Sequence, residues 1–340
     1  MHIYGGDKVD FPTWPNLFSK FDAQTYAMGD CFLFSADVAA IYLNPARMGD
    51  RRHFLIEEGY EWRSTIGFCG ENVLNTPHLI GVTYPYRNLS FGIAYATLCN
   101  LRQRAGLRPG IDLFDTSILR GLFLGVRYKL SNKFYSGVSA ILISGDAHFP
   151  RACEIGFERR DNGKGFGVMV GVLFRCNPKF ILAMKIQSPL FIKGTSNRID
   201  IGLYPQGIEY HYSYPIESRY FYPCNISLGV STNLSDVLQF ALQVDYIGWR
   251  DGYWEWGKDE WDIHLGMERK IGTFLSIRGG FCSCFFPDPE KSEEATKWFL
   301  TGGCGINVPF GKANIGTGLG EELWPLSWRK ILLADIRINF

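Results

Sequence analysis

The feature that most constrains the fold is an alternation of apolar with polar or small residues, which recurs from about residue 50 to the end of the chain. In "NISLGVSTNL", Ile226, Leu228 and Val230 alternate with serine, glycine and asparagine, and "ILLADIRINF" alternates in the same way. A period of two indicates β-strands whose two faces meet different surroundings. The second face is too polar for a sandwich core and too rich in small residues for a solvated surface.

The alternating segments form a regular series with two kinds of connection. Tight turns, such as Ser235-Asp236, alternate with longer links, including loops predicted at 99–117, 147–163 and 190–222. An even strand number with short turns at one end and long loops at the other is typical of a transmembrane β-barrel. The about fourteen strands are expected at 53–66, 77–85, 88–98, 118–130, 133–146, 164–177, 179–189, 223–235, 237–250, 260–271, 273–284, 297–309, 311–320 and 328–340.

A soluble Greek-key sandwich is the main alternative for a chain with many strands. Sandwich strands usually have about five or six residues, whereas many strands here have ten or more, as a tilted bilayer crossing requires. The aromatic stretch "YIGWRDGYWEWGKDEW" (246–261) resembles the girdle that marks a lipid interface. We therefore predict an all-β protein, an antiparallel transmembrane β-barrel of about fourteen strands.

Composition and motifs argue against several other classes. A net charge of +1 disfavours nucleic acid as a partner. The nine cysteines include no C-x-x-C pair, and the six histidines show no metal-ligand spacing, so neither a metal nor a cofactor is expected. No G-x-S-x-G elbow occurs, and "GKGFGVMVG" (163–171) lacks the lysine-serine ending of a P-loop. The chain is not expected to be an enzyme.

Residues 1–50 do not alternate and are predicted to form a separate unit from the barrel at 51–340. Ser35 is a candidate N-cap for a helix through "ADVAAIYL", and Asn44 followed by Pro45 repeats the signature of a helix start. Short helical pieces ahead of a barrel need a surface to pack on. The barrel interior supplies one, so we expect a hatch, or plug.

The segment "AQTYAMGDCFLFSADVAAIYLNPARMG" (23–49) resembles the N-terminal motif of the long-chain fatty-acid transporter (FadL) family and its PorV-like relatives. Arg47 stands where the family usually has glycine after Asn-Pro-Ala. The resemblance implies a plugged barrel in the bacterial outer membrane that passes hydrophobic molecules inward. The matching hatch positions are Met28, Gly29, Asp37, Ala40, Tyr42, Asn44, Pro45 and Ala46.

We therefore expect an outer-membrane channel for passive transport of small hydrophobic compounds, of the fatty-acid or hydrocarbon class. Its partners would be outer-membrane lipid and a hydrophobic small molecule. The alternative is a PorV-like scaffold that holds secreted or envelope proteins through its long loops, without transport. Candidate ligand-binding residues are the apolar run beside the hatch and aromatics of the longest loop: Phe32, Leu33, Phe34, Phe191, Tyr220 and Phe221.

The last strand is predicted to close the barrel. Ile336 and Ile338 would face lipid, whereas Asp335, Arg337 and Asn339 would face the lumen. The resemblance implies that the barrel-assembly machinery recognises this strand by its terminal Phe340. The other charges expected inside the lumen are Arg127, Lys129, Lys185, Asp245, Glu268 and Arg278. They would pair with hatch carboxylates such as Asp37 or, as the alternative, line the water path of an ion-selective pore.

Overall fold

The structure, a computed structural model, describes residues 22–35, 38–49, 52–65, 72–76, 78–104, 114–151, 155–204, 207–248, 259–287, 294–323 and 326–339. Its strands are β1 His53–Thr65, β2 Asn72–Asn75, β3 His78–Tyr86, β4 Leu89–Arg104, β5 Phe114–Lys129, β6 Phe134–Arg151, β7 Ile155–Asn177, β8 Phe180–Gln187, β9 Leu190–Tyr204, β10 Gly207–Tyr222, β11 Asn225–Asn233, β12 Leu238–Ile247, β13 Glu260–Ile271, β14 Leu275–Pro287, β15 Glu294–Val308, β16 Gly311–Leu323 and β17 Leu326–Asn339. None of the described helices is long and apolar enough to cross a membrane.

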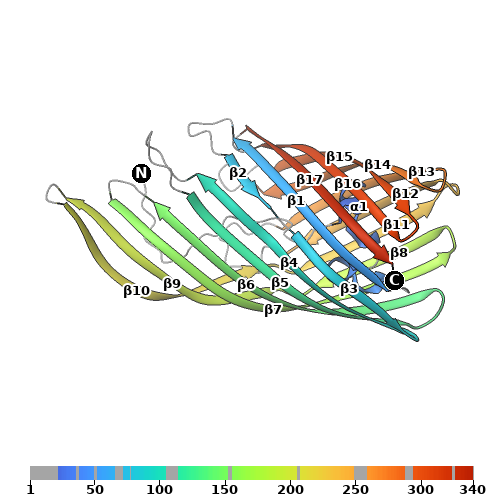
Figure 1. The fold of residues 1–340 in the computed structure, drawn as a ribbon, viewed down its shortest axis with the longest axis horizontal. Helices are drawn as coiled ribbons and strands as arrows, with labels where there is room; N and C mark the ends of the chain where they lie inside the picture. The colour runs from blue at the N-terminus through green and yellow to red at the C-terminus, as the bar shows by residue number, and fades with distance from the viewer. Residues whose placement is uncertain are drawn as a thin grey trace.

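The 17 strand segments make a closed antiparallel barrel of 14 strands. Three of the 14 strands are interrupted, and each gives two segments. The segments β2 and β3 both pair with β1, and β8 and β9 both pair with β7. The third interrupted strand consists of β10, which pairs with β9, and β11, which pairs with β8. The barrel closes where β1 pairs with β17, from His53 opposite Asn339 to Thr65 opposite Ser327. Figure 1 shows this closing pair across the front of the molecule.

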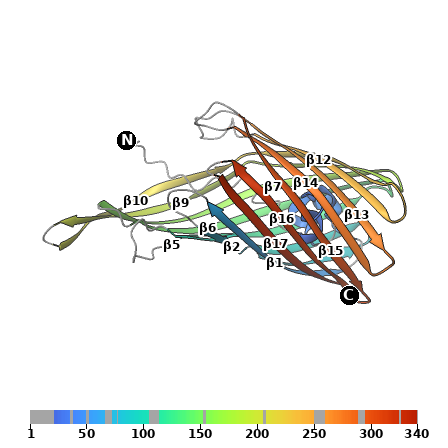
Figure 2. The same cartoon turned by 90° about the horizontal axis from the view of Figure 1, so that it is seen from above.

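The predicted barrel and its closing strand are confirmed, and each predicted strand overlaps one of the observed ones. The predicted loops are the main error. Residues assigned to a loop at 190–222 form β9 and β10, which pair along their length, and β6 and β7 run far into the predicted loop at 147–163. These strands are longer than a tilted strand needs to cross a bilayer, and the β9–β10 hairpin projects beyond the rest of the wall (Figures 1 and 2).

The alternation of the sequence separates an outer from an inner face. On β17, Leu332 and Ile336 are exposed on the outside, whereas Asp335 and Arg337 are buried inside, as predicted. The other exposed large side chains, such as Leu142, follow the same rule on their strands. An apolar outer surface around a polar interior is the inverse of a soluble barrel, and it suits a lipid surround.

The interior is filled by the N-terminal segment, in four short helical pieces. These are α1 Ala23–Tyr26, the 3₁₀ turn η1 Phe32–Phe34, α2 Ala40–Leu43 and the 3₁₀ turn η2 Pro45–Arg47. The helix α1 packs on β15 to β17, η1 on β8 and β11, and η2 on β5 to β7, so the segment contacts wall strands all around the barrel. Figure 2 shows it ringed by strands. We call residues 22–49 the hatch.

One helix start differs from its prediction. Ser35 does not cap a helix: α2 begins only at Ala40, and the Ser35 hydroxyl instead donates to a carboxylate oxygen of Asp22. Asn44 does act as predicted, because it is the N-cap of η2, with Pro45 in the first turn and its side chain accepting from the Ala46 N–H. The local sequence was enough to predict the helix start at Asn44-Pro45. It was not enough at Ser35, whose hydroxyl makes a buried hydrogen bond to Asp22 instead.

Candidate functional site

The Met28-Gly29 step of the hatch lies directly against the barrel wall. Gly29 has a φ of 71°, in the left-handed region that favours glycine. Glycines on the wall allow the backbones to meet: a Cβ on Gly266 would lie 2.2 Å from the Met28 oxygen, and one on Gly280 would lie 2.0 Å from the Gly29 nitrogen. The Gly29 N–H donates to Thr301 Oγ1 at 2.8 Å. This step is therefore a fixed hatch–wall contact.

The Asn-Pro-Ala block makes a second contact of the same kind on another side of the barrel. Gly137 of β6 and Gly171 of β7 leave room for it, because a Cβ on either would come within 2.4 Å of Pro45 or Asn44. Asn44 also donates to the Leu33 oxygen at 3.1 Å, which joins two turns of the hatch. Arg47, in place of the usual glycine, donates to the Phe34 oxygen at 3.3 Å. The motif residues thus shape and seat the hatch.

A buried apolar cluster occupies the middle of the hatch. Phe32, Leu33 and Phe34 are each at most 8% exposed and pack in one core with α2 and the wall. Leu33 approaches the wall through another small residue, since its Cδ1 lies 3.0 Å from where Gly229 would carry a Cβ. Tyr42 stacks at a tilt on Phe123 of β5, with ring centroids 5.6 Å apart. The predicted apolar run is therefore in the barrel interior.

Charged groups fix one end of the hatch to the closing strands. Arg337 of β17 pairs with Asp22 at the start of α1 and, through Nε, with Asp335 at 3.2 Å. Asn314 donates to the same Asp335 at 2.7 Å, and the Asp22 N–H donates to Glu57 of β1. Removing one member of such a buried set leaves an uncompensated charge. Lumen charges therefore pair with the hatch as predicted, but through Asp22; Asp37 lies outside the described residues.

Other lumen charges predicted from the alternation also lie inside. Arg278 Nε contacts Glu268 at 2.6 Å, Lys185 lies 4.1 Å above the Phe32 ring, and Arg127 lies over Tyr135. Lys129 is the partial exception, because it is half-exposed near the β5–β6 turn. Paired and ring-stacked cations leave an interior that resembles a packed plug more than an ion-selective pore.

The wall has a break in its hydrogen-bond ladder between β8–β9 and β10–β11, next to the buried Leu190. On one side Gln187 of β8 pairs with Asn225 and Leu190 of β9 pairs with Tyr222, but the intervening residues form no ladder pair. The register sets Pro189 opposite Pro223, and proline has no N–H to donate. Ser188 and Cys224 bond outward instead, to Val168 and Gly248. Two neighbouring strands are therefore unpaired over the same two residues.

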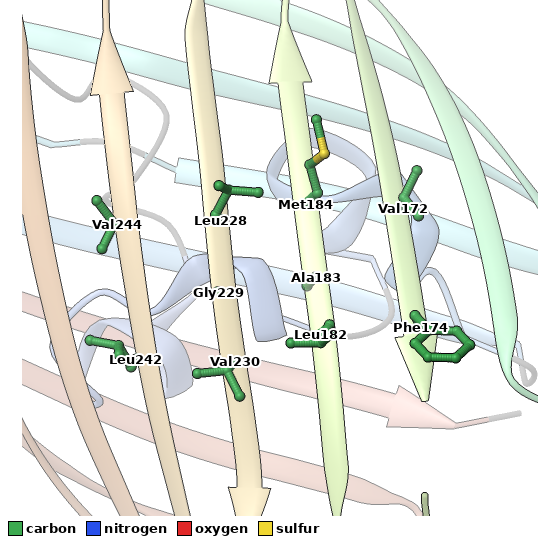
Figure 3. A pocket seen from close by; sticks show the side chains of 10 residues that line it. All are labelled: Val172, Phe174, Leu182, Ala183, Met184, Leu228, Gly229, Val230, Leu242 and Val244. Carbon is green, nitrogen blue, oxygen red and sulfur yellow. The ribbon is translucent and has the colours of Figure 1, made fainter. Parts of the chain in front are cut away.

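An open groove of about 490 Å³ lies on the outer face of the same strands (Figure 3). The outward side chains of β7, β8, β11 and β12 line it, and the small inward residues Ala183 and Gly229 form its floor. Those two residues are directly opposite each other in the β8–β11 register. Leu33 and Phe34 of the hatch touch the Gly229 position from inside. The groove and the apolar cluster thus lie on opposite sides of one part of the wall, and the ladder break lies about five residues farther along the same strands.

The structure gathers only part of the predicted ligand set. Phe32, Leu33 and Phe34 lie together, whereas Phe191 is 56% exposed on β9 and points away from the hatch. Tyr220 and Phe221 belong to β10, and their side chains lie outside the described residues, as does Phe340. Ile336 is 56% exposed and Ile338 half-exposed on the outer face of the last strand.

Spacing rules missed one group of side chains. Asp245 of β12 and Asp262 and His264 of β13 converge inside the wall, with ligand-type atoms all within 4.8 Å of one another. The spacing of the histidines gave no sign of this group, because its members come from two strands and the two on β13 are only two residues apart. In a barrel, Asp262-x-His264 is itself a signal, since residues two apart share a face.

Comparison with known proteins gives the fold but no sequence relative: no family model and no curated protein matches the chain. Among solved structures, the Ralstonia pickettii toluene transporter TbuX matches with a TM-score of 0.72 at 13% identity, over 95% of this chain and 99% of that one. A Pseudomonas aeruginosa FadL homologue matches with a TM-score of 0.72 at 13% identity, over 94% and 98%. The monoaromatic hydrocarbon channel CymD matches with a TM-score of 0.69 at 12% identity, over 88% and 92%.

The fold and the hatch define a class, the hatch-plugged antiparallel β-barrel with an apolar outer surface. Within that class, the chain has the fold of the FadL homologue and of the hydrocarbon channels named above, as the resemblance of residues 23–49 implied.

Proposed function

We propose that the protein is an outer-membrane channel that lets small hydrophobic compounds, of the hydrocarbon or fatty-acid class, pass by diffusion. The observation that carries the proposal is the apolar hatch cluster of Phe32, Leu33 and Phe34, which packs on β8 and β11, the two strands whose ladder is interrupted about five residues farther along. The toluene and hydrocarbon channels with this fold support the choice of ligand class. An apolar path with few polar groups is what such a ligand needs.

We further propose that the ligand leaves the lumen sideways, between β8–β9 and β10–β11. An intact ladder would have to lose hydrogen bonds before a molecule could pass, at a cost of several kcal/mol for each unsatisfied group in lipid. Opposite Pro189 and Pro223 this cost is already removed, because neither residue has an N–H. A molecule that leaves the Phe32–Phe34 cluster would move about five residues along β8 and β11 to reach this gap, and outside it would meet the apolar face that carries the groove lined by Leu182 and Leu228. From there it would enter the bilayer.

The scaffold alternative rested on a long irregular loop at 190–222. In the structure these residues form the paired strands β9 and β10, so the reason for expecting partner contacts through a loop there no longer holds. Recognition by the barrel-assembly machinery through Phe340 stays a prediction, as that residue lies outside the described chain.

A reversible lock tests the exit. Ser188→Cys, in a background that keeps Cys224 and replaces the other native cysteines, places two thiols opposite each other across the gap with both prolines kept, a pairing compatible with disulfide geometry. We expect oxidised protein to lose uptake of toluene or oleate by cells that lack their own transporter, and reductant to restore it. The control lock, Phe180→Cys with Thr232→Cys, joins the same two strands where they are already paired, outside the groove, and should leave uptake unchanged. Equal uptake by oxidised and reduced gap mutants would refute the lateral exit.

The ligand site needs a separate test. Phe32→Asn with Phe34→Asn should abolish uptake, because polar amides would replace the apolar contacts of the passing molecule. Phe310→Asn makes the same chemical change in an exposed turn and serves as the control. Heat-modifiable gel migration shows whether each variant keeps a folded barrel. A folded double variant with normal uptake would contradict the assignment of the cluster.

A further inference from the structure

Three side chains next to the apolar hatch cluster, where His264 lies edge-on to Phe32, converge on one point inside the wall. Asp245 and Asp262 are directly opposite each other in the β12–β13 register, and His264 follows Asp262 on the same face. All three are buried: Asp262 is 0% exposed, and the side chains of Asp245 and His264 are 2% and 1% exposed. Like charges directly opposite on neighbouring strands are destabilising. Two buried carboxylates in this position call for a positive charge close by.

The orientation of His264 indicates where that charge would lie. Its Nδ1 is 2.9 Å from the Gly29 carbonyl oxygen, which can only accept, so Nδ1 carries the hydrogen. In the neutral ring, Nε2 is then a lone pair, and it lies 3.1 Å from Asp245 Oδ2. Nε2 makes no hydrogen bond of good geometry within the described residues, and Cys282 of β14 lies opposite His264 in the strand register. A lone pair and a carboxylate oxygen at this separation repel unless a cation is shared between them.

We propose that Asp245, Asp262 and His264 bind one divalent transition-metal ion, with Zn²⁺ the best fit. One imidazole nitrogen and two carboxylate oxygens are ligands that zinc accepts, at bond lengths of about 2.0–2.2 Å. Tetrahedral bonds of that length separate ligand atoms by about 3.3 Å, close to the 3.1 Å between His264 Nε2 and Asp245 Oδ2. Ca²⁺ takes about six to eight oxygen ligands, so this set suits it poorly.

The ligands are held by partners of the kind that support metal sites. A ligating histidine usually donates its other ring N–H to a backbone carbonyl or a carboxylate, and His264 does so to Gly29. Asp245 accepts from Gln243 Nε2 at 3.0 Å on both of its oxygens. The Gln243 Oε1 accepts in turn from the Leu33 N–H at 2.9 Å. Both supports run to the hatch, so a bound ion would fasten the hatch to β12 and β13.

The experiment measures metal binding by the complete protein, purified in detergent and freed of metal with a chelator. Titration with Zn²⁺, followed by elemental analysis after dialysis, should give one ion per chain, and Co²⁺ in its place should give the visible absorption of a tetrahedral nitrogen–oxygen site. Asp262→Asn and His264→Gln each remove one ligand and should weaken binding about 100-fold or more. His78→Gln removes a histidine on β3, away from the site, and should bind as the native protein does.

Two results would overturn the zinc site. Native protein that retains no Zn²⁺ would mean that the positive charge is a proton on His264, and ligand variants that retain as much Zn²⁺ as the native chain would place the ion elsewhere. Heat-modifiable migration shows whether each variant is folded. If His264→Gln does not fold, Asp262→Asn supplies the same comparison with almost no change of shape. Zn²⁺ should also raise the temperature at which the folded band of the native protein disappears, but not that of Asp262→Asn.

Discussion

Gly280 of β14 is the wall position that the hatch backbone approaches most closely at Gly29. A Cβ at Gly280 would lie 2.0 Å from the Gly29 nitrogen and 2.4 Å from the Met28 carbonyl carbon. To reach the 3.4 Å of an ordinary contact, the hatch backbone would have to retreat by about 1.4 Å. Both partners are backbone, so no side chain can rotate to relieve the clash. We expect Gly280→Ala to displace the Met28-Gly29 step.

The size of the effect follows from the contacts that are lost. Overpacking of this kind costs about 1–3 kcal/mol, and a retreat of the hatch would also break the Gly29 N–H bond to Thr301, worth about 1 kcal/mol. Because the lost hydrogen bond is itself part of the overpacking cost when that cost is at its highest, we expect the free energy that keeps the hatch closed to fall by about 2–3 kcal/mol. That fall corresponds to an open population about 30-fold to 150-fold larger. Barrel strands elsewhere keep their pairing, so the barrel itself should survive.

Cys31 reports the opening. It is 1% exposed in the hatch, and burial raises the pKa of its thiol, so the closed hatch holds it as the unreactive neutral form. With the other eight cysteines replaced, the rate of maleimide labelling measures how often the hatch leaves its seat. Gly280→Ala should raise that rate by about the same 30-fold to 150-fold.

Gly279 is the matched control, one residue away on the same strand. Its Cβ would meet only the Thr301 oxygen, at 4.0 Å, because the position faces the other side of the sheet. Gly279→Ala should therefore leave the labelling rate of Cys31 unchanged. Equal rates in the two alanine variants, whether both high or both low, would refute the reasoning that wall glycines seat the hatch.

Three further predictions follow from contacts of the wall and the hatch. Arg337→Gln leaves Asp22 and Asp335 buried without their cation and should lower the free energy of unfolding by about 3–5 kcal/mol in urea titration; a loss under 1 kcal/mol would mean that the pair is not buried as described. Asn44→Ala should cost about 1 kcal/mol and Asn44→Ser less, since the serine hydroxyl keeps an uncharged cap to the Ala46 N–H; the reverse order in thermal melts would contradict the capping role. Val138→Arg, on the outer face of β6, should destabilise the barrel by about 2–4 kcal/mol in lipid bilayers, and no loss there would count against a lipid-facing Val138.

The sequence predicted those parts of the fold that depend on local periodicity. Alternation on β17 assigned Ile336 to the outside and Arg337 to the inside because a strand repeats every two residues, whatever its partners. Tight turns such as Ser235-Asp236 set the connectivity in the same way. The prediction of a loop at 190–222 was wrong because glycine and proline interrupt the alternation there. The pairing of β9 with β10 therefore has little signal in the local sequence.

The site was harder to predict because its members are far apart in sequence. The hatch motif located Gly29 and Asn44, but nothing local indicates that Gly280 or Gly171 lies against them. The ladder break also depends on two prolines, 189 and 223, that face each other only once the register is known. The predicted helix cap at Ser35 was wrong for the same reason, because the Ser35 hydroxyl donates to Asp22, which lies outside the local sequence.

The length of β7 has a consequence for the height of the molecule. The strand has 23 residues, whereas a tilted strand crosses the hydrocarbon with about 9–11. The remainder, at about 3.3 Å per residue, extends for roughly 40 Å along the chain. This length is added at the end where β9 and β10 also project (Figure 1). With the barrel placed in a bilayer as proposed, this side of the wall would stand about as tall above the lipid as the hydrocarbon is thick, so an arriving molecule meets protein well before it meets membrane.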